Sequence, residues 1–346
     1  MKRLIIALLI AACALSASLA AASPALANQK PGAGITVKPG RATWNTGYIL
    51  EAIVREGLVE LGYTVAPVKE LTNPLFYQSV YLGDLDYWAN GWFPTHDNQL
   101  PRRFYEGADK YGRIMEAGGL QGYLVSKDAV EKYNIQSLAD FKRPEVRKAF
   151  DEDGDGKAEL VACPAGWGCE KAIAHHMKVY ELEDHIKPIK ASYSASIADA
   201  LAKQRAGKPV ILYTWAPNWV LSKFKPGENV MWINVPEINP NEAQKGSEDR
   251  MVVSGLKGAV SDPIKLGFIA SDIHVVANKK FAEANPAAKR FFELFTIPLA
   301  DVSAQNDRMN DGENSTQDIQ RHAQEWVKAN QQQWNEWMAA ARAAAQ

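Results

Sequence analysis

The stretch GYILEAIVREGLVELG (residues 47–62) decides the fold class, because its apolar spacing is that of an amphipathic helix. Apolar side chains recur every three or four residues until the closing glycine, at Ile49, Leu50, Ile53, Val54, Leu58 and Leu61. A short β-rich segment, ITV, precedes the stretch, and YTVAPV (63–68) follows it. Strand-like and helical segments continue to alternate along most of the chain. This alternation predicts an α/β fold with a largely parallel sheet.

The first 27 residues have the pattern of a secretory signal peptide. The basic start Met1-Lys2-Arg3 precedes a long apolar run, and ALA at 25–27 fits a cleavage site. The box IAAC, which ends at Cys13, offers an alternative in which Cys13 carries a lipid anchor. Because the apolar run continues past Cys13 to the ALA site, we favour cleavage after residue 27 and export of a soluble chain.

Length and charge exclude several classes of protein. The chain has 346 residues, enough for two domains of ordinary size. Loss of the signal peptide leaves 37 basic against 40 acidic residues, a net charge of −3, which is not typical of a nucleic-acid-binding protein. The G-x-S-x-G, Walker and H-E-x-x-H motifs of common enzymes do not occur. We therefore expect a protein without catalytic activity, cofactor or nucleic-acid partner.

Two cysteines remain after the signal peptide, and both lie in CPAGWGC (163–169). Disulfides persist in exported proteins, and a lone pair leaves a single pairing, Cys163 with Cys169. Closing so small a ring stabilises a fold by only about 2 kcal/mol. We therefore expect the bridge to fix the shape of a loop that presents Trp167 between two glycines.

Tryptophans follow three predicted strands from separate parts of the chain. LDYWAN leads to Trp92, AELVA to the loop of Trp167, and PVILYT to Trp215. Ligands of open α/β sheets bind at the carboxyl ends of strands, so the three rings are predicted to share one site. Indole faces attract cations, and quaternary ammonium groups are their best-known ligands. Trp44 and Trp219 are weaker candidates for this aromatic cage, and the remaining tryptophans are predicted to pack in the core: Trp88, Trp232, Trp326, Trp334 and Trp337.

The segment after Cys169 supplies the opposite pole of the predicted site. Its helical spacing places Gly168 and Cys169 at a helix start, where backbone N–H groups have no intrahelical partner and favour an anion. His96, four residues after Trp92, is expected to donate a further hydrogen bond to that anion. A small zwitterion, with its ammonium in the cage and its carboxylate at the helix start, fits both poles.

The acidic loop DEDGDGKAE (151–159) resembles the first half of an EF-hand calcium loop. Asp151, Asp153 and Asp155 occupy ligand positions, but position 12 is Ala162 and not the bidentate glutamate. A solvated acidic turn is therefore the preferred interpretation, calcium is the weaker alternative, and no metal is expected.

Together these motifs resemble the periplasmic glycine betaine/proline betaine-binding proteins of osmoprotectant ABC importers. The likeness covers nearly the whole exported chain, and GWGCE and YTWAPNW are its most specific parts. It implies a two-lobed periplasmic-binding-protein fold of type II, each lobe a mostly parallel sheet flanked by helices, with two crossing strands and the ligand in the cleft. It also implies that the three cage tryptophans box the ammonium. His96 and the backbone of Gly168 and Cys169 would then hold the carboxylate.

The resemblance sets the remaining expectations. Residues 28–120 and 270–346 are expected to form lobe 1, and residues 121–269 lobe 2. The protein would be a periplasmic monomer that delivers glycine betaine or proline betaine to an ABC permease in the inner membrane. A choline- or carnitine-binding protein is the main alternative, and a secreted carbohydrate binder or hydrolase is a more distant one. Trp44 and Phe93 depart from the more polar residues expected in the family and bear on the ligand range.

Overall fold

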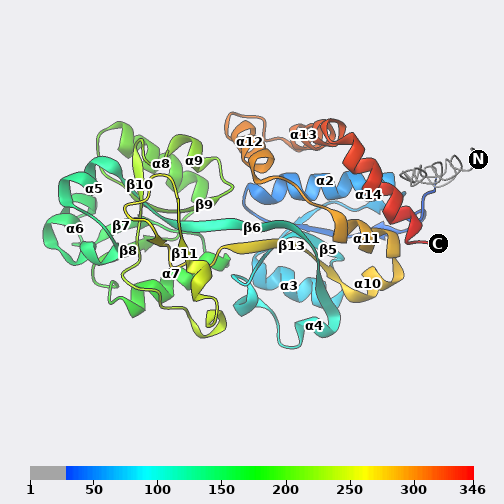
Figure 1. The fold of residues 1–346 in the computed structure, drawn as a ribbon, viewed down its shortest axis with the longest axis horizontal. Helices are drawn as coiled ribbons and strands as arrows, with labels where there is room; N and C mark the ends of the chain where they lie inside the picture. Colours follow the sequence, from blue (N-terminus) through cyan, green and yellow to red (C-terminus); the bar gives the residue numbers. More distant parts are fainter. Residues whose placement is uncertain (1–28) are drawn as a thin grey trace, which may run out of the picture.

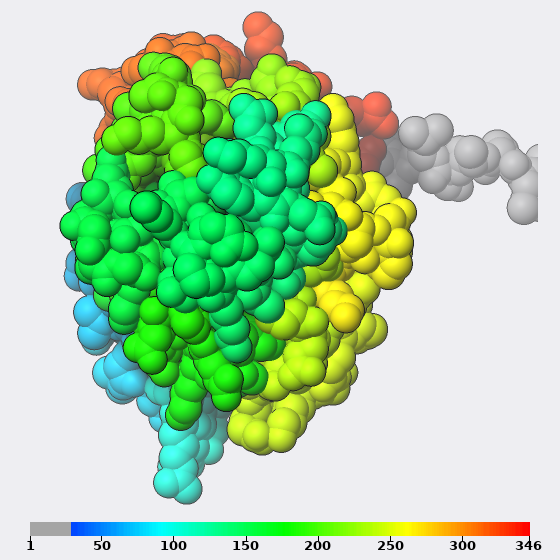
Figure 2. Space-filling view, turned by 90° about the vertical axis from the view of Figure 1, so that its left-hand side faces the viewer, coloured from blue at the N-terminus to red at the C-terminus, as the bar shows by residue number. Residues whose placement is uncertain are grey.

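A computed structural model describes residues 29–346; the predicted signal peptide and Cys13 lie outside the described residues. The chain forms two lobes side by side, with the long strand β6 (Ala108–Ser126) running from one into the other (Figure 1). Seen end-on from the second lobe, green and yellow segments form one continuous face, and first-lobe segments emerge only at its edges (Figure 2). The helices of the described part of the chain are too short or too polar to cross a membrane.

The first lobe contains both ends of the described chain. Its earlier elements are β1 (Thr36–Val37), β2 (Pro39–Arg41), α2 (Thr46–Glu60), β3 (Thr64–Val65), β4 (Lys69–Glu70), α3 (Asn73–Leu82), β5 (Tyr87–Phe93), the 3-10 turn η1 (Asp97–Gln99) and α4 (Phe104–Gly107). Its later elements are β13 (Ser271–Asn278), α10 (Lys279–Ala284), α11 (Pro286–Leu294), α12 (Leu299–Asn310), α13 (Thr316–Ala329) and α14 (Gln331–Ala343).

The second lobe is formed by the middle of the chain. It contains α5 (Lys127–Tyr133), η2 (Leu138–Lys142), α6 (Pro144–Phe150), β7 (Ala158–Val161), α7 (Gly168–Val179), β8 (Ile186–Ile189), α8 (Tyr193–Arg205), β9 (Ile211–Ala216), α9 (Val220–Lys223), β10 (Val230–Ile233), η3 (Glu242–Gln244), η4 (Glu248–Met251), β11 (Val252–Val253) and β12 (Ile264–Lys265).

One sheet runs through both lobes in the order β4-β2-β5-β13-β6-β9-β7-β8, and β10 also pairs with β6. The outer strands of each lobe pair in parallel: β2 with β4 and β5, and β7 with β8 and β9. Antiparallel pairing involves β6 and β13, the two long strands near the middle. Strand β6 pairs with β13 as far as Gly119 and with β9 from Leu120 onward. The predicted α/β two-lobed fold is confirmed.

The local predictions hold best where apolar spacing is clear. Helix α2 forms as expected, ends at Glu60, and buries Ile49, Ile53 and Val54 in the core. YTVAPV is a strand only at Thr64–Val65, because it pairs with the two-residue β1 alone.

Three tryptophans fall in elements that differ from the prediction. Strands β5 and β9 do not end before Trp92 and Trp215 but continue through them, because both tryptophans still face paired residues on β13 and β6. The spacing of Trp326, Trp334 and Trp337 is compatible with one helix, but the structure has two helices that meet at Asn330, so Trp326 lies in α13 and the other two lie in α14.

Candidate ligand-binding site

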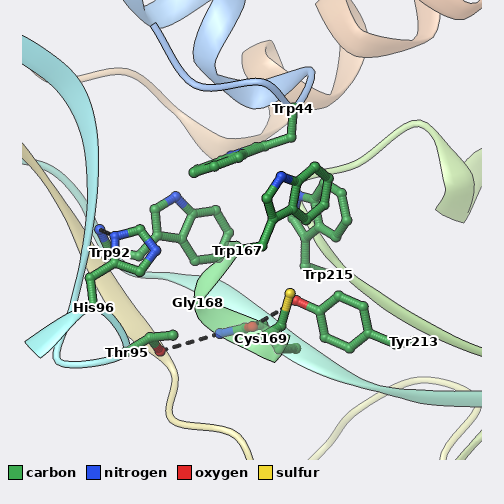
Figure 3. Close-up of a pocket in the computed structure, with 10 residues that line it drawn as sticks. Trp44, Trp92, Thr95, His96, Trp167, Gly168, Cys169, Tyr213 and Trp215 are labelled. Carbon is green, nitrogen blue, oxygen red and sulfur yellow. Dashed lines mark hydrogen bonds between the residues drawn. The ribbon is translucent and has the colours of Figure 1, made fainter. Parts of the chain in front are cut away.

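A cavity lies between the two lobes (Figure 3). Its walls come from the turn before α2, from β5 and the turn after it, from β6, from the start of α7 and from β9. The lining residues are Trp44, Trp92, Thr95, His96, Gln121, Trp167, Gly168, Cys169, Tyr213 and Trp215. The structure therefore brings together all six residues of the predicted site and the weaker candidate Trp44. It does not bring in Trp219, which lines a neighbouring pocket.

Four indole rings surround the cavity (Figure 3). Trp44 and Trp167 meet edge to face with ring centroids 5.3 Å apart, and Trp167 meets Trp215 in the same manner at 5.5 Å. Trp92 lines another wall, and its indole N–H donates to Asn90 Oδ1. All four cage rings are at least nine-tenths buried. Edge-to-face packing of this kind leaves parts of the ring faces free to contact a bound ligand.

The opposite pole is the start of α7. Trp167 is the N-cap, and α7 begins at Gly168 as predicted. The backbone N–H groups of Gly168 and Cys169 have no acceptor among residues 29–346. The predicted disulfide between Cys163 and Cys169 is present, with the two Cα atoms 6.3 Å apart, and ties this helix start to the end of β7. These free donors and the positive end of the helix dipole make the pole suitable for an anion.

His96 lies against the anion pole from the first lobe. Its Nδ1 atom accepts the Trp92 backbone N–H at 3.2 Å and lies 2.7 Å from Tyr77 Oη. Burial lowers the pKa of His96 to about 3, so the ring is neutral near pH 7. Because Nδ1 accepts, the single ring proton resides on Nε2. A Cβ built at ideal geometry on Gly168 would lie 2.9 Å from that nitrogen, which places Nε2 beside the start of α7.

Asn73 adjoins the same imidazole nitrogen. Its amide lies 3.1 Å from Nε2, and its Oδ1 atom has no partner among the described residues. If the Asn73 side-chain amide were rotated by a half turn, its Oδ1 atom could accept the Nε2–H. The hydrogen bond from Asn73 to Gln99 would then be lost. The Nε2–H of His96, whose ring lines the cavity, is therefore available to a further acceptor.

A polar chain forms the floor of the cavity, and the sequence analysis missed it. Tyr213 Oη donates to Gln121 Oε1 at 2.7 Å, and Gln121 Nε2 donates to Thr95 Oγ1 at 3.4 Å (Figure 3). The Thr95 hydroxyl also lies 2.6 Å from the Ser271 hydroxyl. The only sequence signals were the position of Thr95 beside His96 and of Tyr213 before Trp215. The described residues that line the cavity carry no formal charge, with His96 neutral. The site therefore suits a ligand with no net charge, because an uncompensated ion would be costly to bury.

The acidic loop lies apart from the cavity, beside β7. Asp151 accepts the backbone N–H groups of Gly154 and Gly156, and the Lys187 ammonium lies 2.7 Å from Asp155 and also contacts Asp153. Turn hydrogen bonds and a lysine contact these carboxylates. One oxygen each of Asp151, Asp153 and Glu159 also lies within 4.8 Å of the others, so the solvated turn and the weaker calcium alternative both stay predictions.

Comparisons with known proteins agree with this geometry. Residues 35–329 match the family described as the substrate-binding domain of ABC-type glycine betaine transport systems. The chain is 40% identical to the glycine betaine-binding periplasmic protein OusX of Dickeya dadantii (strain 3937), over 92% of this chain and 93% of that protein. It is 39% identical to the glycine betaine/proline betaine-binding periplasmic protein of Escherichia coli (strain K12), over 91% and 92%.

Solved structures share the fold at lower identity. Lactococcal OpuAC in its closed conformation with glycine betaine has a TM-score of 0.66 at 17% identity, covering 88% of this chain and 99% of its own. A choline-binding protein of an ABC transporter in complex with choline also has a TM-score of 0.66, at 18% identity over 90% and 98%. Family match, relatives and fold agree: this chain belongs to the family of substrate-binding domains of ABC-type glycine betaine transport systems.

Proposed function

We propose that this chain captures glycine betaine, or a close relative such as proline betaine, in the cavity between its lobes. One observation carries the proposal: four indole rings and a free helix start face the same cavity, whose lining bears no formal charge. A molecule that is cationic at one end, anionic at the other and neutral overall satisfies all three features. The names of the relatives that share about 40% of the sequence support the same ligand class.

The two poles divide the binding energy. A quaternary ammonium contacts indole faces at about 1–2 kcal/mol each when desolvated, while micromolar affinity needs about 8 kcal/mol. Trp92, Trp167 and Trp215 form three walls of the proposed cage, and Trp44 forms a fourth. The N–H groups of Gly168 and Cys169, together with His96 Nε2–H, would supply the remaining energy through the ligand carboxylate. Trp219 contributes at most to the entrance, because it lines the neighbouring pocket.

Transport follows from the arrangement of the lobes. We assign residues 28–120 and 270–346 to one lobe and 121–269 to the other, a division supported by the change of partner along β6 at Gly119–Leu120. Ligand contacts come from both lobes, so binding would stabilise a closed state that an inner-membrane ABC permease can recognise. We place the protein in the periplasm as a monomer without enzymatic activity, on the evidence of its signal-like start and its periplasmic relatives.

A choline receptor is the second candidate, favoured by the shared fold of a choline-binding protein. Choline has the same trimethylammonium head but no carboxylate, so the donors of Gly168, Cys169 and His96 would be left unpaired in a closed cavity. Each lost charge-assisted bond costs about 1–3 kcal/mol. Two such bonds at the lower figure give glycine betaine an advantage of about 30-fold, and stronger or additional bonds increase it.

Titration calorimetry with glycine betaine, proline betaine, choline, carnitine and maltose tests the proposal. We expect tight binding of the betaines, weak binding of choline and none of maltose. His96→Ala should reduce the preference for betaine over choline, because it removes a donor that serves the carboxylate alone. Equal affinities for glycine betaine and choline in the wild-type protein would refute the anion pole.

A further inference from the structure

The turn between β2 and α2 connects the first lobe to two cage tryptophans of the second lobe. The Trp215 indole N–H donates to the Thr46 hydroxyl at 3.3 Å, and the Trp167 indole N–H donates to the Thr43 hydroxyl at 3.0 Å. The Thr46 hydroxyl in turn donates to the Pro217 carbonyl at 3.0 Å. All three hydrogen bonds cross the cleft, and two of them fix the plane of a ring that lines the cavity.

The hydroxyl of Thr46 makes hydrogen bonds to the second lobe and none to its own lobe among the described residues. Thr46 is the first residue of α2, but the helix start has no side-chain cap, and both hydrogen bonds of the hydroxyl lead to the second lobe. Thr46 is fully buried and Trp215 is 4% exposed, so water cannot replace either partner while the lobes are together. A buried indole N–H without an acceptor is unfavourable, and the closed arrangement therefore depends on this threonine.

The ring of Trp215 is oriented from two sides. Tyr193 packs on it from the second lobe with ring centroids 4.9 Å apart, and Trp167 meets it edge to face. Packing within the second lobe limits the tilt of the ring, and the hydrogen bond to Thr46 is the polar contact that holds its N–H edge. Trp44, between the two threonines in the chain, packs on Trp167 from the same turn. The turn therefore supplies one ring of the cage, Trp44, and its two threonines orient two other rings.

We propose that Thr46 is a positioning residue that couples closure of the lobes to the orientation of Trp215, and that Thr43 does the same for Trp167 at the exposed rim. Ligand and threonine act on the same ring: the ligand occupies its face, and the first lobe holds its edge. Ligand without lobe closure would meet a ring whose N–H edge is not held, and closure without ligand would leave the ring face without a contact. This inference rests on the proposed function, since it concerns the binding of a quaternary ammonium in the same cavity.

The test compares Thr46→Val, which keeps the shape and removes the hydroxyl, with Thr46→Ser, which keeps the hydroxyl. Thr316→Val, at the first residue of α13 and outside the cavity lining, is the positional control. Calorimetry should show a roughly tenfold loss of glycine betaine affinity in T46V, near-wild-type affinity in T46S, and no change in T316V. Because the hydroxyl acts on closure and not on ligand chemistry, affinity for choline should fall by the same factor. Small-angle X-ray scattering should show less contraction of T46V at equal, subsaturating ligand.

Thr43→Val at the exposed rim provides a second variant that is not expected to disturb folding, and it should weaken binding by a smaller factor. Wild-type affinity in both T46V and T43V would overturn the inference. A loss in T46V that serine does not restore, or a fall in its ligand-free melting temperature with T43V unchanged, would assign Thr46 a packing role and overturn it as well. A wild-type protein that does not bind glycine betaine would instead refute the proposed function.

Discussion

Gly168→Ala is expected to separate closure of the cleft from folding of the lobes. Gly168 is the first residue of α7 and does not have the left-handed backbone conformation that requires glycine. Alanine is compatible with a helix and even favoured there by up to about 1 kcal/mol. The second lobe should therefore fold normally with this substitution.

The obstacle lies across the cleft. A Cβ at this position would meet His96 Cδ2 at 2.6 Å, His96 Nε2 at 2.9 Å and Thr95 Cγ2 at 3.0 Å. The imidazole cannot move away freely, because the Trp92 backbone N–H and Tyr77 hold its other edge. Overpacking of this kind costs about 1–3 kcal/mol, and here the cost falls on the closed state alone. At 1.4 kcal/mol per factor of ten, affinity for glycine betaine should fall by a factor between about 5 and about 140.

Calorimetry with glycine betaine measures this loss, and thermal unfolding without ligand should give a wild-type melting temperature. The control is a double-mutant cycle with His96→Ala, in which removal of the ring creates space for the methyl group. Gly168→Ala should then cost much less in the His96→Ala background than in the wild type. Wild-type affinity in Gly168→Ala, or equal costs in both backgrounds, would show that Gly168 does not face His96 in the ligand-bound protein.

Three further predictions concern other parts of the molecule. Replacing Cys163 by serine opens the small ring and should lower the free energy of unfolding in urea by about 2 kcal/mol, whereas an unchanged value would show that the bridge does not restrict the unfolded chain. Burial lowers the pKa of His96 and of His176 to about 3, so only the unfolded chain takes up these protons as the pH falls from about 6.5 toward 3. The free energy of unfolding should therefore decrease over that window by up to about 2.7 kcal/mol per pH unit. When it is measured by urea titration at several pH values, its slope against pH should correspond to about one proton fewer in His176→Gln than in the wild type. Identical slopes would contradict the lowered pKa of His176. Trp44→Ala should weaken betaine binding by about 1–2 kcal/mol in calorimetry, whereas Trp219→Ala should change it by less than about 0.5 kcal/mol, and the reverse order would exchange the roles of the two rings.

Local patterns predicted the alternation of strands and helices and the start of α7, whereas the two-lobed arrangement was implied only by the family resemblance. The spacing in α2 and the start of α7 after Trp167 are readable from neighbours in the chain. The floor of the cavity was missed because Gln121 and Tyr213 acquire their function only by hydrogen bonding to each other across 92 positions of the chain. No local pattern marks such a pair.

The two weaker cage candidates also show that local sequence cannot predict features that depend on long-range contacts. Trp44 and Trp219 both follow short turns, and sequence alone could not decide which ring faces the cavity. The decision depends on the relative position of the lobes, which places Trp44 over Trp167 and leaves Trp219 on the adjacent pocket. Strand ends were also misplaced, because the pairing of Trp92 and Trp215 with β13 and β6 extends both strands.

The position of β13 has a consequence for the order in which the chain can fold. This strand lies between β5 and β6 in the sheet, yet it begins only at Ser271, after the whole second lobe. Strand β9 pairs with β6 from Leu120↔Ala216 to Val125↔Ile211, whereas β13 pairs with β6 from Gly119↔Ser271 to Ala108↔Asn278. The pairing inside the second lobe therefore closes a shorter loop than the insertion of β13 does. We expect the second lobe to gain protected amides first, and the centre of the first lobe only when β13 inserts. Pulse-labelling hydrogen exchange during refolding would separate these two stages of amide protection. Simultaneous protection of β5 and β9 would mean that the lobes fold as a single unit.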